Sequence, residues 1–199
     1  MDYKKALAKD KKLKKVLIHE IAIPGISKNI TMSLVGSILG QQLSIQVAKV
    51  MHGRFLELFD GKMPTADDIL KMPNATIKAI GISQQKANYI HNVAEFISTR
   101  KITFTKLQKM TDDEVIELLT EIKGVGRWTV EMILIFSLGR EDVFAVDDLG
   151  IQKGMIELFK LQDLPKKELR IKMMELSKRW FPYRSYVCLH LWKFSGFKP

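Results

Sequence analysis

The 199-residue chain has very little cysteine or histidine. Cys188 is its single cysteine, which excludes an intrachain disulfide and a cysteine-ligated cluster. The four histidines lie far apart in the sequence, without the close spacing of a zinc site: His19, His52, His91 and His190. We therefore expect a protein of a reducing compartment with no metal site and no cofactor.

Long apolar runs are also missing. The longest, MILIFSLG at 132–139, is far shorter than the roughly 20 residues that span a bilayer. The N-terminal stretch MDYKKALAKDKKLKK lacks the apolar core of a signal peptide, and strict alternation of apolar and polar residues is hard to find. The sequence therefore gives no reason to expect a membrane partner or a β-sheet.

Apolar residues instead recur at intervals of three and four, which predicts an all-α protein. Thr65, Ser83 and Thr111 each precede such a pattern as helix N-caps, and acids follow Thr65 and Thr111 in the first turn. No repeat or low-complexity linker is present. We predict helices at about 4–21, 28–59, 66–71, 84–99, 112–121, 127–138, 148–160, 166–179 and 183–194.

Positive charge is in excess, with 32 Lys and Arg against 22 Asp and Glu. This balance favours a polyanionic partner, nucleic acid before membrane. The densest basic block, KDKKLKK at 9–15, has the helical spacing of a solvated face. Basic residues also lie among the aromatic residues of the C-terminal segment. This arrangement fits a contact with DNA better than solvent exposure alone, but it is weak evidence.

The stretch KGVG at 123–126 predicts a tight turn between two helices. Gly124 and Gly126 permit backbone angles closed to other residues and let a polyanion approach the amides. The next helix begins there, so its unpaired N–H groups and positive dipole end face the same point. The arrangement suits one phosphate. A glycine-capped turn without a ligand would look the same.

Two adjacent acids, Asp147 and Asp148, stand at the start of a later helix, and Asp148 lies 22 positions after Gly126 (148 − 126). One of them is expected to cap the helix. The second exceeds what capping requires. A carboxylate in a cleft can stabilise an oxocarbenium-like transition state or orient a water.

Five stretches together resemble the helix-hairpin-helix DNA glycosylases of base-excision repair, and most closely 3-methyladenine DNA glycosylase II. Each is modest alone, but they run in family order from about residue 28 to 196. They are LVGSILGQQLS (34–44), GISQQKA (81–87), IKGVGRWTVEM (122–132), DVFAVDDLGIQKG (142–154) and RWFPYRSYVCLHLW (179–192).

The resemblance implies a role for each motif. It makes Asp148, in DLGI, the catalytic aspartate and leaves Asp147 as the helix cap. It implies that the hairpin binds a backbone phosphate beside the lesion. Hairpins of this family often hold a monovalent cation through turn carbonyls, so the resemblance allows a cation here. The hairpin residues concerned are Gly124, Val125, Gly126 and Arg127.

The resemblance also places Trp128 and Trp192 in the base pocket, where indole faces attract cationic methylated bases. Met132 and Leu149 stand where some relatives have tyrosine, which leaves the substrate range open. Trp128 occupies the position of the lysine that forms a Schiff base in strand-cutting members, so we expect base cleavage only. By itself, Trp192 fits core packing equally well.

Base flipping leaves a hole in the duplex that a side chain must fill. The resemblance points to the loop with Gln41, Gln42 and Leu43, and Gln42 falls where relatives place the wedging residue. Polar residues packed between helices are the alternative.

The expectation is a single all-α glycosylase domain over 1–199, with a DNA-binding cleft between two lobes. Lobe A comprises 1–25 and 127–199, lobe B comprises 28–125, and the helix-hairpin-helix covers about 112–138. The expected function is monofunctional excision of alkylated purines from double-stranded DNA by a monomer. It would act in the cytoplasm (nucleoid) of a bacterium or archaeon, or in a eukaryotic nucleus. The alternatives are a glycosylase for oxidised or deaminated bases and a non-catalytic DNA-binding protein.

Overall fold

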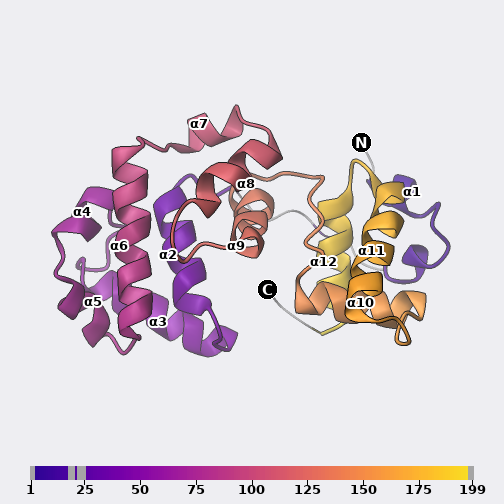
Figure 1. Ribbon diagram of the computed structural model, residues 1–199, viewed down its shortest axis with the longest axis horizontal. Coiled ribbons are helices and arrows are strands. Elements are labelled where there is room, and N and C mark those ends of the chain that lie inside the picture. The colour runs from indigo at the N-terminus through magenta and orange to yellow at the C-terminus, as the bar shows by residue number, and fades with distance from the viewer. Residues whose placement is uncertain (1–2, 18–20, 22–25, 197–199) are drawn as a thin grey trace. The chain divides into compact units, whose positions relative to one another are not determined.

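The computed structural model describes residues 3–17, 21 and 26–196, which form helices joined by turns (Figure 1). None of these residues forms a strand, so the all-α prediction is confirmed. The first helices are α1 (Tyr3–Leu7), η1 (Leu13–Lys15), α2 (Ile30–Gly40), α3 (Ile45–Glu57), α4 (Ala66–Lys71), α5 (Asn74–Ala79), α6 (Gln84–Thr99) and α7 (Phe104–Gln108). The others are α8 (Asp112–Thr120), α9 (Arg127–Met132), the π-helix η2 (Ile133–Ser137), α10 (Leu149–Phe159), α11 (Lys166–Ser177), η3 (Lys178–Trp180) and α12 (Arg184–Phe194).

The chain divides into two compact units. Unit 1 comprises Met1–Gly25 and Leu134–Pro199, and unit 2 comprises Ile26–Ile133. The boundary expected from the sequence lay before α9. In the structure α9 packs against α8 across the hairpin, and this contact assigns it to unit 2.

Unit 2 is built around α6, which packs against α2, α4 and α5 (Figure 1). Its buried side chains recur every three or four positions and form one apolar stripe: Ala87, Ile90, Val93, Ala94 and Ile97. The predicted caps are confirmed. Thr65 and Thr111 form capping boxes with Asp68 and Glu114, and the side chain of Ser83 accepts the amide of Lys86.

Unit 1 joins the N-terminal segment to the C-terminal helices. The hydroxyl of Tyr3 lies 3.3 Å from Nε2 of His190 on α12, and Tyr3 stacks on Tyr186 at 4.1 Å between ring centroids. Nε1 of the buried Trp180 donates to Asp10 at 3.1 Å. Residues from both ends of the sequence therefore share one core.

Two long helices expected from the sequence are each interrupted. The predicted helix 4–21 stops at Leu7, because the carboxylate of Asp10 accepts the amides of Lys12 and Leu13 and makes a turn. Positions 18–20 lie outside the described residues. The predicted helix 28–59 is broken into α2 and α3, since Ser44 caps a new helix.

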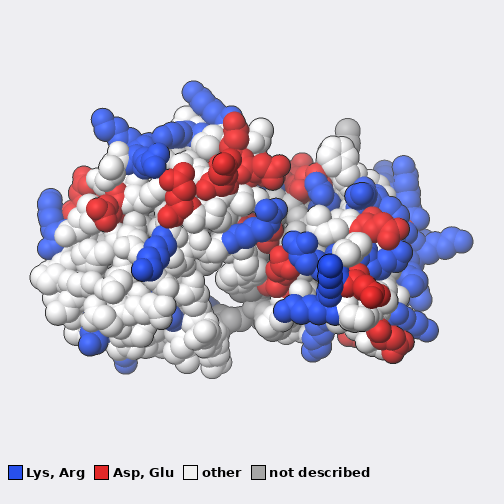
Figure 2. All heavy atoms as spheres, in the orientation of Figure 1, with Lys and Arg blue, Asp and Glu red and all other residues white. Residues whose placement is uncertain are grey.

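Unit 1 also carries most of the positive charge, with 19 Lys and Arg against 11 Asp and Glu, whereas unit 2 has 13 against 11. In Figure 2 the face of unit 1 turned to the viewer is crowded with Lys and Arg, and acids gather over α8 in unit 2. The part of the chain that the structure describes contains no helix that could span a membrane.

Candidate functional site

The hairpin between α8 and α9 contains two glycines with different backbones. Gly124 has φ +106°, in the region that favours glycine, and the amide of Val125 closes the turn on the carbonyl of Ile122 at 2.9 Å. Gly126 is the N-cap of α9 with extended backbone (φ −95°, ψ 169°). The N–H groups of the first turn of α9 lie beyond reach of intrahelical carbonyls, as at every helix start.

The two glycines also have different surroundings. A Cβ at Gly124 would overlap the ring of Tyr89 from α6, whereas a Cβ at Gly126 would meet no atom within 4 Å. The missing side chain at Gly124 therefore serves packing inside the protein. Only at Gly126 does the missing side chain leave open space beside the start of α9.

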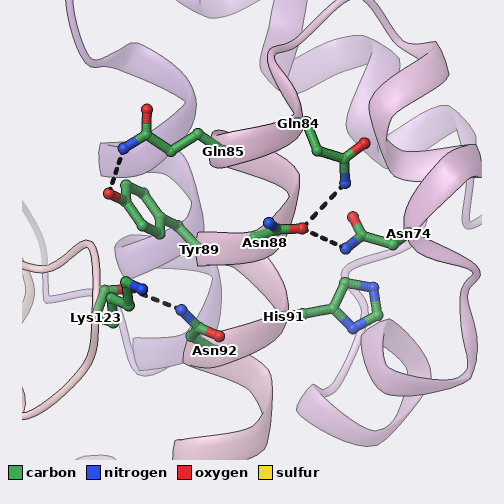
Figure 3. Close-up of a pocket in the computed structure, with 8 residues that line it drawn as sticks. All are labelled: Asn74, Gln84, Gln85, Asn88, Tyr89, His91, Asn92 and Lys123. Carbon is green, nitrogen blue, oxygen red and sulfur yellow. Dashed lines mark hydrogen bonds between the residues drawn. The ribbon is translucent and has the colours of Figure 1, made fainter.

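Donors from α6 and from the turn after α2 hold the hairpin carbonyls in place. Nδ2 of Asn92 donates to the carbonyl of Lys123 at 3.0 Å (Figure 3), and Nε2 of Gln41 donates to that of Gly124 at 3.4 Å. The hairpin is thus tied to α6 and to the turn after α2. A monovalent cation at the turn carbonyls stays a prediction.

The remaining hairpin residues point different ways. The side chain of Val125 is buried in unit 2, with 5% of its surface exposed. Arg127 is about half exposed, and its Nε donates to Oε1 of the buried Glu131 at 3.1 Å, one turn further along. This ion pair fixes the Arg127 side chain, whose backbone begins α9, along the first turn of that helix.

A pocket of about 560 Å³ lies beside the hairpin, along the exposed side of α6 (Figure 3). Most of its polar lining groups are already bonded to one another. Nε2 of Gln85 donates to the hydroxyl of Tyr89 at 2.6 Å, and Oδ1 of Asn88 accepts from Asn74 and Gln84. These bonds lie within α6 and between α6 and α5, whereas Asn92 alone among the lining side chains is shown donating to the hairpin.

The predicted wedge residues form the turn that separates α2 from α3. Gln41 is half-buried and bonded to the hairpin, while Gln42 and Leu43 are exposed. Gln42 has φ +60°, a left-handed backbone that is uncommon for a residue other than glycine. Which side chain fills the duplex stays a prediction, but Gln42 and Leu43 are the two that project.

Lys86 on α6 reaches this turn. Its Nζ donates to the carbonyls of Leu39 at 2.9 Å and Gln41 at 2.8 Å. Partial burial lowers the pKa of Lys86 below the ordinary value for lysine. The sequence pattern around Lys86 predicted a helix, but it did not predict these hydrogen bonds to the turn after α2.

In unit 1, Asp148 is the N-cap of α10. Its Oδ1 accepts the amide of Ile151 at 2.8 Å and Nε1–H of Trp192 at 2.7 Å, and only 3% of the residue is exposed. The identification of Asp147 as the cap is therefore wrong. The carbonyl of Asp148 accepts the amide of Gln152, so the helix begins at Leu149 and the residue immediately before it is the cap.

Asp147 has a different partner. Its two oxygens accept Nε and a terminal nitrogen of Arg170 on α11, at 2.9 and 3.3 Å, and its side chain is about half exposed. The adjacent acids thus differ sharply in environment. One is a solvated ion pair, and the other is buried among hydrogen-bond donors.

The predicted base-pocket residues fall in both units. Trp192 and Leu149 belong to unit 1 with Asp148, whereas Trp128 and Met132 belong to unit 2 with the hairpin. Trp192 is 2% exposed and stacks on Phe136 at 5.7 Å between centroids, while Leu149 is 71% exposed. The part of each in base recognition stays a prediction.

No three His, Cys, Asp or Glu side chains gather as possible metal ligands within the part of the chain that the structure describes.

Comparisons with known proteins identify the class. Residues 35–181 match the family described as HhH-GPD superfamily base excision DNA repair protein. DNA-3-methyladenine glycosylase 1 of Schizosaccharomyces pombe is 37% identical over 164 residues, which cover 81% of this chain and 71% of that protein. The chain belongs to the HhH-GPD superfamily of base excision DNA repair proteins, as its motifs suggested.

Solved structures agree over almost the whole chain. The S. pombe 3-methyladenine DNA glycosylase Mag1 in complex with abasic DNA matches with a TM-score of 0.86 and 31% identity, over 99% of this chain and 98% of that one. DNA-3-methyladenine glycosidase from Bacillus halodurans matches with a TM-score of 0.85 and 35% identity, over 98% and 90%. Within the superfamily, this chain is thus similar to proteins named for 3-methyladenine.

Proposed function

We propose that this protein is a monofunctional DNA glycosylase that releases alkylated purines of the 3-methyladenine type from double-stranded DNA and so initiates base-excision repair. Its similarity to 3-methyladenine DNA glycosylases over most of the chain supports the substrate class. The observation that carries the chemistry is the burial of Asp148 at the start of α10, between two hydrogen-bond donors.

The reaction needs a negative charge near the sugar. A purine methylated on a ring nitrogen is positively charged and leaves readily, so no general acid is required. As the glycosidic bond lengthens, positive charge develops on the sugar ring, and the carboxylate of Asp148 stabilises it while water attacks C1′. Burial of Asp148 strengthens this interaction, because little water screens it.

DNA binding relies on backbone contacts. The amides at Gly126 and at the start of α9 suit a phosphate, Arg127 lies beside them, and the excess charge of the chain adds affinity for any duplex. Gln42 fills the space left by the flipped base. We propose that the protein acts as a monomer, in the nucleoid of a bacterium or archaeon or in a eukaryotic nucleus.

The test is release of bases from DNA treated with a methylating agent, followed by chromatography of the free bases. We expect 3-methyladenine among the products and the strand to stay intact until alkali is added. Release of only oxidised or deaminated bases from matched substrates would refute the alkylation proposal. DNA binding with no base released would instead indicate a non-catalytic DNA-binding protein.

A further inference from the structure

Lys86 links α6 to the end of α2. Its Nζ donates to the carbonyls of Leu39 and Gln41, at 2.9 and 2.8 Å, across more than 40 positions of sequence. The last carbonyls of a helix have no intrahelical partner and carry the negative end of the helix dipole. The ammonium group of Lys86 satisfies one of them, that of Leu39, together with the carbonyl of Gln41, the residue that caps the end of α2.

The turn that follows is held from its other side as well. The side chain of Gln41 donates to the carbonyl of Gly124, and the amide of Leu43 donates to the carbonyl of Gly40 at 3.1 Å. Gln42, between these fixed points, is exposed and has φ +60°. Because a left-handed backbone is unfavourable for glutamine, neighbouring contacts must hold it.

We propose that Lys86 is the positioning residue of the duplex-filling turn, Gln41 to Leu43. The proposal rests on the proposed function, in which this turn enters the space left by the flipped base. A filling side chain acts only if its backbone is rigid and correctly aimed. Lys86 supplies that rigidity from α6, the same helix whose Tyr89 and Asn92 hold the hairpin.

The first test compares Lys86→Met with Lys78→Met, which removes an exposed lysine of the same unit from α5. Single-turnover excision is measured on an alkylated base in a fully paired duplex and on the same base opposite an abasic site. We expect Lys86→Met to lose about 10- to 100-fold on the paired duplex. On the base that has no pairing partner the loss should be under about threefold, because flipping needs less help there. Equal losses on the two substrates would overturn the proposal.

The second test asks whether Lys86 acts through the wedge. In a Gln42→Ala background, Lys86→Met should cost little more, whereas a separate structural role would make the two losses multiply and so refute the proposal. Lys86→Arg, which still donates to two carbonyls, should recover most of the paired-duplex rate. No recovery by arginine would count against positioning by these hydrogen bonds.

A third measurement needs no catalysis. The amide of Leu43 should exchange with solvent faster in Lys86→Met, while amides of the α6 core keep wild-type protection. Unchanged exchange at Leu43 refutes the positioning role even if the enzyme is active. If the wild type releases no base but Leu43 loses protection, the glycosylase proposal fails and the tether stands. Should Lys86→Met not fold, Lys86→Gln gives the same comparison.

Discussion

Trp192 donates its indole N–H to the carboxylate of Asp148 at 2.7 Å, from α12 to the start of α10. Trp192, which the motif resemblance places in the base pocket, is thus also a hydrogen-bond partner of Asp148. Because Trp192 is buried and stacked on Phe136, its position is set by the core of unit 1. The hydrogen bond from Trp192 therefore fixes the carboxylate of Asp148 relative to that core.

Asp148→Asn should abolish base release while leaving DNA affinity and fold nearly intact. An amide oxygen can still accept from Ile151 and Trp192, so the stability loss should be about 1 kcal/mol or less. It cannot stabilise a developing cation, so the single-turnover rate should fall by several orders of magnitude. Asp147→Asn is the matched control: it weakens an exposed ion pair and should leave the rate unchanged. Near wild-type excision by Asp148→Asn would show that the acid is misidentified.

Trp192→Phe should separate the indole N–H from the ring. The phenyl ring can still stack on Phe136, but the buried acid loses a donor, at a stability cost of about 1–3 kcal/mol. We expect slower excision with unchanged affinity for abasic DNA. In an Asp148→Asn background the substitution should slow the residual reaction little further. A wild-type rate in the single variant would mean that the hydrogen bond serves stability alone.

The hairpin glycines should respond differently to substitution. Gly124→Ala forces a side chain against Tyr89 at φ +106° and should cost more than about 1 kcal/mol in thermal unfolding. Gly126→Ala should stay within about 0.5 kcal/mol of wild type, since its Cβ meets no atom. Gly126→Leu should then fold but bind every duplex sequence more weakly. Full affinity of Gly126→Leu would exclude this point as a phosphate contact.

We expect Trp128 to give the enzyme a preference for cationic bases. We also expect the enzyme to lack lyase activity. Tryptophan has no amine for an imine, so borohydride should trap no enzyme–DNA adduct, and a trapped adduct in the wild type would overturn the monofunctional reading. Trp128→Ala should reduce excision of cationic bases more than of neutral ones, by about 1–2 kcal/mol of transition-state stabilisation. The rate at which Trp128→Phe excises cationic bases should lie between the rates of the wild type and of Trp128→Ala. Equal losses for both kinds of base would identify Trp128 as a packing residue.

Local signals in the sequence predicted local structure well. The predicted ranges 66–71 and 84–99 coincide with α4 and α6. Thr65 and Ser83 directly precede these helices and cap them through amides only three positions further along the chain. The two long helices were wrong because residues inside the predicted ranges interrupt them, Asp10 in one and Ser44 in the other. Contacts that the sequence could not show reinforce both breaks: Trp180 donates to Asp10, and Lys86 donates to the carbonyl of Leu39 at the end of α2. Both of these donors lie far away in the sequence.

The site divides in the same way. The motifs located the hairpin turn, the turn at 41–43 and the acid pair at a helix start, which short stretches of chain specify, while the roles of these residues stay predictions. The choice of cap between Asp147 and Asp148 failed, because Arg170 and Trp192, each more than 20 positions away, decide which acid is solvated. The role of Tyr89 behind Gly124 had no signal in the sequence either, since tyrosine on a helix fits many settings.

The division of the chain has a consequence for biosynthesis. Unit 2 is one continuous stretch, so it can fold while the C-terminal helices are still being translated. Unit 1 needs Tyr3 to meet His190, 187 positions later, and must wait for α12. Closing so long a loop is slow, and the lysine-rich N-terminal segment stays unpaired until it is done. Substitutions in α12 should therefore reduce the yield of folded protein by delaying this last step, even where they spare the acid.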